Sequence, residues 1–294
     1  MRSLLKALNS GKILISDGAW GTFLHKSGLE PGECPELWNL TNRDKVFAIA
    51  KSYIDAGTDM ILTNSFGGSP FKLKHYGLED IVYEINKAAA EISREAAGEE
   101  KFVLGSVGPT GVMLMMGEVS EDELFNGFKI QAEALADGGA DAICIETMSA
   151  LDEAVLAVKA AKEFTDLEVV CTFTFEKTIN NDFRTMMGVS PTEMVKALKD
   201  AGASVIGTNC GNGFDQMVDI VKEIRTADSE IPVLVHANAG KPVFQNGVTV
   251  FPETPEVMAP KIKKLISAGA NIIGGCCGTT PEHILAMVKE AGKI

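Results

Sequence analysis

The sequence predicts a (β/α)8 TIM barrel that forms one domain over residues 1–294, and three observations support this fold. Eight short runs rich in branched apolar residues alternate with eight helical patterns. The length of 294 residues is normal for such a barrel. No stretch rich in Pro, Ser or Gly divides the chain. An open, doubly wound sheet is the competing architecture.

The expected strands are short runs that end in Gly, Asn, Thr or Cys. In order they are Ile13–Asp17, Met60–Phe66, Phe102–Gly108, Ala142–Thr147, Val169–Phe175, Val205–Gly211, Val233–Asn238 and Ile272–Cys277. The helical patterns after them are Asp44–Ala56, Asp80–Ala97, Glu121–Asp137, Leu151–Glu163, Pro191–Ala201, Asp215–Thr226, Pro255–Ala268 and Pro281–Ala291. Several end in Ala-Gly, where glycine can close a helix in the left-handed conformation. The Met-rich stretch Val112–Val119 is expected to pack beside the core rather than to form a loop over the barrel mouth.

The composition excludes several classes of partner. The formal net charge is −13 and the sequence pI is about 4.8, which argues against nucleic-acid backbones and anionic lipid surfaces. The N-terminus lacks the apolar segment of a signal peptide, and no run has the length of a membrane span. Six cysteines are too few for a disulfide scaffold, so we expect a cytoplasmic protein with free thiols.

The adjacent pair Cys276-Cys277 is the most unusual feature of the chain. Neighbouring side chains in a strand point to opposite faces, but the glycines around this pair permit other backbone torsions. Cys210 lies in a similar glycine-rich frame. Three thiolates suit zinc, although the spacing alone leaves open a buried thiol pair or a strained vicinal disulfide. All three cysteines end predicted strands, and barrel active sites lie at those ends, which favours zinc.

The other three cysteines are assigned no chemistry. Cys144 and Cys171 lie within apolar runs and are expected in the core, whereas Cys34 is an incidental loop residue.

Polar residues gather at the same predicted rim. Asp17 and Glu146 end the first and fourth strands, and two carboxylates beside an anionic metal centre would suit a substrate ammonium group. Asp17 could instead be a turn acceptor or helix cap, and Glu146 a buried ion-pair partner. We interpret His236 as a structural, hydrogen-bonded imidazole, and His283 as a surface or capping residue. No phosphate-binding or dinucleotide motif is present in the sequence.

These motifs together resemble the homocysteine S-methyltransferase family, most closely the homocysteine-binding barrel of cobalamin-dependent methionine synthase. The resemblance spans nearly the whole chain. It is carried by Asp17–Thr22, Thr63–Phe66, Gly108–Gly111, Ile145–Thr147, Asn209-Cys210, Asn238–Pro242 and Gly274–Pro281.

The resemblance implies a zinc-dependent thiol methyltransferase that converts homocysteine to methionine. Cys210, Cys276 and Cys277 would hold zinc, with the homocysteine thiolate as fourth ligand. Asn238 would take that position when substrate is absent. Asp17 and Glu146 would bind the substrate ammonium group, and the backbone at Gly18 and around Ser65 would receive its carboxylate.

The methyl donor is a separate question. We expect methylcobalamin or another methylcorrinoid, which this chain does not bind alone. It would arrive on a separate corrinoid protein or on folate and cobalamin modules missing from this chain. Betaine and S-methylmethionine are alternative donors, but they would favour an aromatic cage and the chain has 3 Tyr and 2 Trp. A zinc hydrolase and a non-catalytic zinc or redox-sensing protein are the alternatives from other classes.

Overall fold

The computed structural model describes residues 2–245 and 248–292, and its centre is an eight-stranded parallel sheet that curls into a nearly closed barrel. The strands follow one another around the barrel as β1, β2, β3, β4, β5, β8, β9 and β12, and β12 pairs back with β1. Their bounds are β1 Leu14–Ile15, β2 Met60–Leu62, β3 Phe102–Val107, β4 Ala142–Met148, β5 Glu168–Phe173, β8 Val205–Asn209, β9 Val233–Ala237 and β12 Ile272–Gly275. The predicted barrel and all eight of its strands are confirmed.

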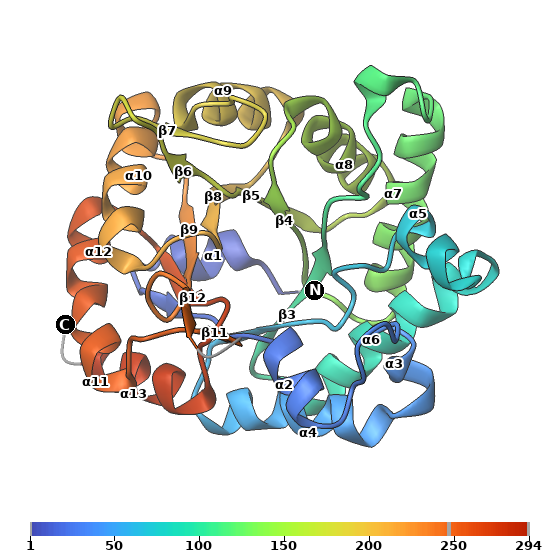
Figure 1. The fold of residues 1–294 in the computed structure, drawn as a ribbon, viewed down its shortest axis with the longest axis horizontal. Helices are drawn as coiled ribbons and strands as arrows, with labels where there is room; N and C mark the ends of the chain where they lie inside the picture. The colour runs from blue at the N-terminus through green and yellow to red at the C-terminus, as the bar shows by residue number, and fades with distance from the viewer. Residues whose placement is uncertain (1, 246–247, 293–294) are drawn as a thin grey trace.

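Helices surround the strands as a ring (Figure 1). The longer helices are α4 Arg43–Asp55, α6 Val82–Ala97, α7 Glu121–Asp137, α8 Leu151–Phe164, α9 Pro191–Ala201, α10 Phe214–Ala227, α12 Ile262–Ala268 and α13 Pro281–Ala291. The shorter ones are α1 Leu4–Leu8, α2 Gly21–Lys26, α3 Trp38–Thr41, α5 Pro70–Leu73 and α11 Pro255–Met258, with 3-10 turns at Lys74–Tyr76, Glu79–Ile81, Leu114–Met116 and Ala259–Lys261. The predicted helix 255–268 is therefore broken, because Pro260 has no N–H to continue it.

Two small antiparallel hairpins were not predicted. One joins β6 Glu176–Lys177 to β7 Phe183–Arg184, and the other joins β10 Val243–Gln245 to β11 Val248–Val250. Both lie in segments that follow barrel strands, so they belong to the same rim of the molecule as the predicted site.

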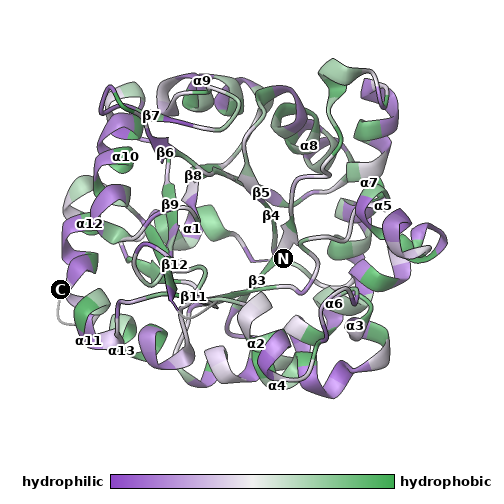
Figure 2. Ribbon diagram, viewed as in Figure 1, coloured by the Kyte–Doolittle hydropathy of each residue, from purple (hydrophilic) through white to green (hydrophobic). Residues whose placement is uncertain are grey.

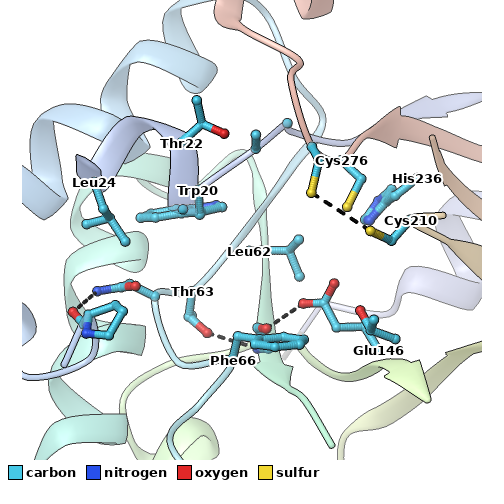
Figure 3. A pocket seen from close by; sticks show the side chains of 18 of the residues that line it. Trp20, Thr22, Leu24, Leu62, Thr63, Phe66, Glu146, Cys210, His236 and Cys276 are labelled. Carbon is cyan, nitrogen blue, oxygen red and sulfur yellow. Dashed lines mark hydrogen bonds between the residues drawn. The ribbon is translucent and has the colours of Figure 1, made fainter. Parts of the chain in front are cut away.

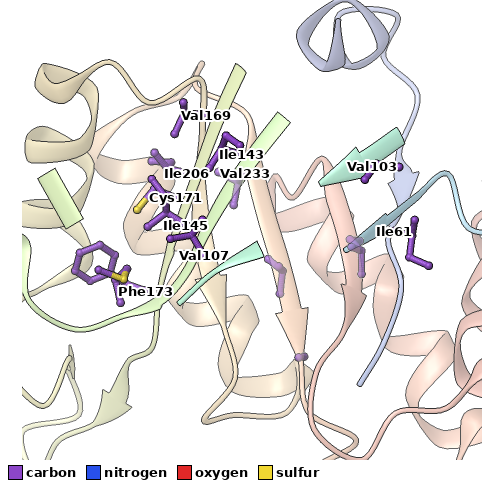
Figure 4. Close-up of a cluster of buried hydrophobic side chains, with 14 of the residues drawn as sticks. Ile61, Val103, Val107, Ile143, Ile145, Val169, Cys171, Phe173, Ile206 and Val233 are labelled. Atoms are coloured by element: carbon purple, nitrogen blue, oxygen red, sulfur yellow. The ribbon is translucent and has the colours of Figure 1, made fainter. Parts of the chain in front are cut away.

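Most of the core lies between the barrel and the helices. Outward-facing strand residues such as Ile61, Val103, Ile143 and Val169 pack against the inner faces of the helices (Figure 4). The hydropathy colouring shows apolar strands in the centre and helices that carry both apolar and polar stretches (Figure 2). Strands buried on both faces are near-continuous apolar runs, which explains why the sequence pattern identified them.

The closure between β1 and β2 uses aspartate side chains. Asp59 donates its backbone N–H to the Ile15 carbonyl at 2.7 Å, and its carboxylate accepts the Ile15 N–H at 2.9 Å. At the upper end of the same seam, Asp17 accepts the Leu62 N–H at 2.9 Å. The predicted site residue Asp17 therefore also stitches the barrel together.

Helix α1 closes the lower end of the barrel, at the amino ends of the strands, and acts as its plug. Leu4 and Leu8 are buried against inward-facing residues such as Leu14, Met60 and Leu104. No helix in the described part of the chain is both long and apolar enough to cross a membrane.

We expect the plug to depend on Glu168, at the start of β5. Its carboxylate accepts hydrogen bonds from Ser3 Oγ at 2.6 Å, from the Leu5 N–H at 3.1 Å and from the Leu4 N–H. Glu168→Ala should therefore lower the free energy of unfolding by about 1–2 kcal/mol and expose α1 to hydrogen exchange. Urea unfolding and exchange mass spectrometry measure both effects. Glu168→Gln, which keeps an acceptor, should lose less, and equal stability of Glu168→Ala and the parent protein would refute the assignment.

Candidate metal and substrate site

Three cysteine side chains meet at the upper rim of the barrel, which is the rim at the carboxyl ends of the strands. Cys210 directly follows β8, and Cys276 and Cys277 directly follow β12. Their three Sγ atoms all lie within 4.8 Å of one another, and the Cys210 and Cys277 sulfurs are 3.8 Å apart (Figure 3). The predicted convergence of these residues is confirmed, and it forms a group able to hold a metal ion.

Unusual backbone torsions bring the sulfurs together. Cys210 has a φ of 59°, in the left-handed region that non-glycine residues seldom occupy, and its N–H donates to the His236 carbonyl at 2.9 Å. After β12 the chain turns through Gly278, which has a φ of 80°. A side chain at Gly278 would also collide with the Phe251 ring, because an added Cβ would lie 2.3 Å from it.

The chemistry of these donors fits a thiophilic metal ion. Hydrogen bonds from Cys276 and Cys277 lower the pKa of the Cys210 thiol, so its sulfur ionises first of the three. The pKa values of Cys276 and Cys277 are raised, because each shares its proton with the Cys210 sulfur. A cation at this point would replace the shared protons, since only the thiolate is a metal ligand. Asn238, 2% exposed, has a buried Oδ1 atom without a hydrogen-bond partner, so an oxygen donor is also available nearby.

The cysteines line a cavity of about 400 Å³ at the barrel mouth. Glu146, at the end of β4, lies on the same wall, and Gly18 and Ser65 also line the cavity. Trp20 and Phe66 are the two aromatic side chains of the described cavity wall (Figure 3). The cavity therefore combines a sulfur cluster with a carboxylate.

Glu146 is a buried acid without a cationic partner in the described residues. Ser106 Oγ donates to its Oε1 atom, and burial raises the pKa of Glu146 to about 7. The alternative that Glu146 is an ion-pair partner is thus not supported. A substrate ammonium group could supply the missing positive charge.

Asp17 lies behind Gly18 and is not part of the cavity wall. Its Oδ2 atom accepts the Trp20 Nε1–H at 2.8 Å and the Leu62 N–H at 2.9 Å, and burial raises its pKa to about 6. The carboxylate therefore accepts hydrogen bonds from an indole and from a neighbouring strand, which is neither the turn acceptor nor the helix cap of our alternatives, and it adds negative charge beneath the cavity.

Ser65 contributes backbone rather than a free hydroxyl to the cavity. Its Oγ donates to the Ser106 carbonyl at 2.7 Å and lies 2.6 Å from Thr63 Oγ1. Behind this loop, Gln131 donates to the Ser65 carbonyl at 2.8 Å. The loop is thus held from both sides by buried polar groups.

The structure corrects our interpretation of His236 and confirms His283 as a capping residue. His236 is 1% exposed, but its Nε2 atom has no hydrogen-bond partner, and burial lowers its pKa to about 4. A hydrogen-bonded structural imidazole would have found an acceptor there. His283 does cap α13 through Thr280, as expected, but it is 7% exposed and its Nε2 contacts the Glu253 carbonyl at 2.9 Å, so it is not a surface residue.

Glu36 is a cavity residue that sequence reasoning missed. It is 5% exposed, its Oε1 atom accepts the Gly67 N–H at 2.7 Å, and burial raises its pKa. It stands well before the second strand, so no strand-end pattern pointed to it. The core assignments of Cys144 and Cys171 are confirmed, while Cys34 is buried beside Glu36.

The Met-rich stretch after β3 is only partly as expected. Val112, Leu114 and Val119 pack against the core, as predicted. Met115 and Met116, however, are 74% and 68% exposed. The stretch therefore both packs against the barrel and presents apolar surface at its rim.

Comparisons with known proteins identify relatives of this chain. The chain matches the homocysteine S-methyltransferase family over residues 14–291. It is 30% identical over 303 residues to methionine synthase of Mycobacterium tuberculosis, covering 97% of this chain and 25% of that protein. Methionine synthase of Mycobacterium leprae is 29% identical over 287 residues, covering 93% of this chain and 24% of that protein. The chain thus spans about a quarter of the length of these relatives.

A solved structure shares the fold. The metallated form of the homocysteine methyltransferase MmuM from Escherichia coli superposes with a TM-score of 0.79 at 23% identity, covering 96% of this chain and 98% of that one. Because the family match covers nearly all of the barrel, this chain belongs to the homocysteine S-methyltransferase family.

Proposed function

We propose that residues 1–294 form one homocysteine-binding domain that transfers a methyl group to the sulfur of homocysteine, giving methionine. The observation that carries the proposal is the group of three sulfurs within 4.8 Å of one another, on the wall of a cavity that also contains Glu146. A hydrolase would generally need nitrogen and carboxylate ligands that leave the metal acidic, and this donor set is all sulfur.

In this proposal Cys210, Cys276 and Cys277 hold zinc, and the Asn238 Oδ1 atom is the fourth donor when homocysteine is absent. Zinc, when bound, favours the thiolate form of a coordinating thiol near neutral pH. The protein's own residues contribute by positioning the substrate sulfur. The cysteines sit at strand ends, so a substrate sulfur beside them faces the open mouth, where a donor must approach in line.

The first expected outcome concerns the metal. Cys210→Ala, Cys276→Ala and Cys277→Ala should each lose zinc and lower methionine formation by more than about 100-fold, because each removes a charged donor. Zinc per chain from mass spectrometry, together with X-ray absorption, should show one zinc with three protein sulfurs. Cys171→Ala is the control, since this thiol is buried in β5 and should leave the zinc content unchanged. A nitrogen-dominated shell, or zinc retained in all three variants, would contradict the proposal.

Residues of the cavity wall would recognise the ammonium and carboxylate groups of homocysteine. We assign Glu146 to direct contact with the substrate ammonium group and Asp17 to supporting charge behind Gly18. The backbone at Gly18 and around Ser65 would receive the carboxylate. Because burial raises the pKa of Glu146 to about 7, its carboxyl is increasingly protonated as the pH falls through 7. Ammonium affinity should then decrease, since the neutral acid attracts a cation weakly.

We therefore expect Glu146→Gln to weaken homocysteine binding by about 2–5 kcal/mol and to abolish the loss of affinity between pH 8 and pH 6. Asp17→Asn should weaken binding less, because this carboxylate does not line the cavity. Titration calorimetry with L-norvaline, which has a methyl group in place of the thiol, isolates the amino-acid end.

Glu153→Gln is the matched control for this experiment. Glu153 is also a buried carboxyl, 7% exposed with a raised pKa, but it lies outside this cavity. The affinity of the Glu153→Gln protein for homocysteine and for L-norvaline should equal that of the parent protein. Unchanged affinity in both Asp17→Asn and Glu146→Gln would remove these residues from the site.

For the donor we favour a methylcorrinoid carried by a separate protein or module. The exposed apolar side chains support a large partner, because many of them lie in the segments that follow barrel strands. Ten of the sixteen exposed large apolar residues in the described chain lie there: Phe66, Met113, Met115, Met116, Ile179, Met186, Met187, Val243, Phe244 and Val250. Clustered apolar surface marks interaction sites, and flexible methionines adapt to many shapes.

Small onium donors fit the cavity less well. Betaine or S-methylmethionine would gain from an aromatic enclosure, and the described wall offers Trp20 and Phe66. Phe66 is 41% exposed, so it encloses a small donor poorly.

The zinc-loaded protein should therefore demethylate methylcobalamin in the presence of homocysteine, with methionine formed in equal amount, while betaine gives no product. The visible spectrum of the corrinoid follows the reaction, and Cys277→Ala protein serves as the inactive control. If betaine or S-methylmethionine supports turnover while the corrinoid spectrum stays constant, the donor assignment is wrong and the sulfur chemistry stands.

A further inference from the structure

The imidazole of His236 forms part of the cavity wall and has a nitrogen that the protein does not use. The side chain is 1% exposed, and its Nε2 atom is buried without a hydrogen-bond partner. Buried polar atoms in native proteins are almost always paired, so an unpaired one at a binding cavity indicates that a ligand completes it. Figure 3 shows the ring beside the sulfurs of Cys210 and Cys276.

The other side-chain N–H groups of the cavity wall are already committed. Trp20 Nε1 donates to Asp17 at 2.8 Å. Asn64 Nδ2 donates to the Pro35 carbonyl at 2.8 Å and to Asn39 Oδ1 at 3.0 Å. Among the described residues that line the cavity, His236 therefore carries the one side-chain N–H still available to an anionic ligand atom.

Strand register places His236 at the sulfur end of the cavity. β9 lies between β8 and β12, and His236 is level with Asn209 on one neighbour and with Gly274 on the other. Those strands lead directly into Cys210 and Cys276. A Cβ at position 274 would lie 2.8 Å from His236 Cδ2, so glycine there leaves room for the ring.

We propose that His236 donates its Nε2–H to the sulfur of homocysteine when that sulfur lies beside the three cysteines. The proposal rests on the proposed function. The other titratable side chains of the described cavity wall (Glu36, Glu146 and the cysteines) are acids, so the imidazole is the titratable group there that offers an N–H to the substrate's negative charge. A neutral imidazole carries one N–H to donate. The hydrogen bond fixes one lone-pair direction of the sulfur and leaves another free toward the mouth.

Titration calorimetry on the zinc-loaded full chain tests this with a pair of ligands and a pair of variants. His236→Phe should weaken L-homocysteine binding about 10–100-fold, the range for a hydrogen bond to a charged atom. L-norvaline, which lacks sulfur, should bind with its affinity unchanged. His236→Gln keeps an N–H donor and should recover part of the homocysteine affinity.

The zinc content of both variants should equal that of the parent protein. Equal weakening for both ligands would show a structural or amino-acid-end role and overturn the proposal. Loss of zinc, or no change for homocysteine, would overturn it as well.

Nuclear magnetic resonance gives a readout independent of turnover. With ¹⁵N-labelled histidine, the chain has four imidazoles, so the His236 signal can be assigned by its loss in His236→Gln. Homocysteine should move the Nε2–H proton downfield, and norvaline should not. A His236 Nε2–H resonance that does not move downfield in the homocysteine complex would refute the hydrogen bond.

The two proposals fail in different ways. If homocysteine binds with the His236 signature but no donor yields methionine, the proposed function is wrong and the hydrogen bond stands. If methionine forms but the variants and spectra do not respond as stated, the His236 assignment alone is wrong. A parent protein that does not bind homocysteine overturns both.

Discussion

The meeting of three sulfurs at one point is the constraint on which the upper half of the barrel depends. Adjacent residues of a strand face opposite sides, so Cys276 and Cys277 can converge only where β12 has ended and the chain turns through Gly278. Cys210 takes a left-handed conformation for the same purpose, and the His236 carbonyl holds its N–H at 2.9 Å. Strain of this kind persists only when the surroundings enforce it. Here the pairing of β8, β9 and β12 does so, and any slip of β9 would move the site.

The same rim concentrates buried acidic groups, and no buried cation balances them among residues 2–245 and 248–292. Burial raises the pKa of Asp17 from 3.8 to about 6 and that of Glu146 from 4.5 to about 7. At pH values between the ordinary and the raised pKa of each group, the folded chain binds more protons than the unfolded chain. Ionising these groups therefore lowers the free energy of unfolding as the pH rises toward 7. A metal ion beside the sulfurs and an ammonium group beside Glu146 would each relieve this cost. The buried acids therefore favour the binding of cationic groups at this site.

The sequence was sufficient for the parts of the fold and site that follow from strand ends. Parallel strands buried on both faces leave long apolar runs, and the residues that end them must share one rim, so Cys210, Cys276, Cys277 and Glu146 were placed together correctly. The five-residue helix α1 and the two hairpins were missed because they are too short to show a period. Glu36 and the unpaired nitrogen of His236 depend on contacts distant in sequence, which no local pattern encodes.

The barrel interior divides into two layers with opposite tasks. Below, α1 and inward-facing residues such as Leu104 and Leu234 form a dry core that carries stability. One layer higher, the inward positions become polar. Two of the five buried side-chain atoms without a partner in the described chain, His236 Nε2 and Asn238 Oδ1, lie at the end of β9, beside the cysteines. A buried polar atom without a partner costs stability. Their position is therefore best explained by ligands that complete them, and the lower layer supplies the stability that lets the upper one remain incomplete.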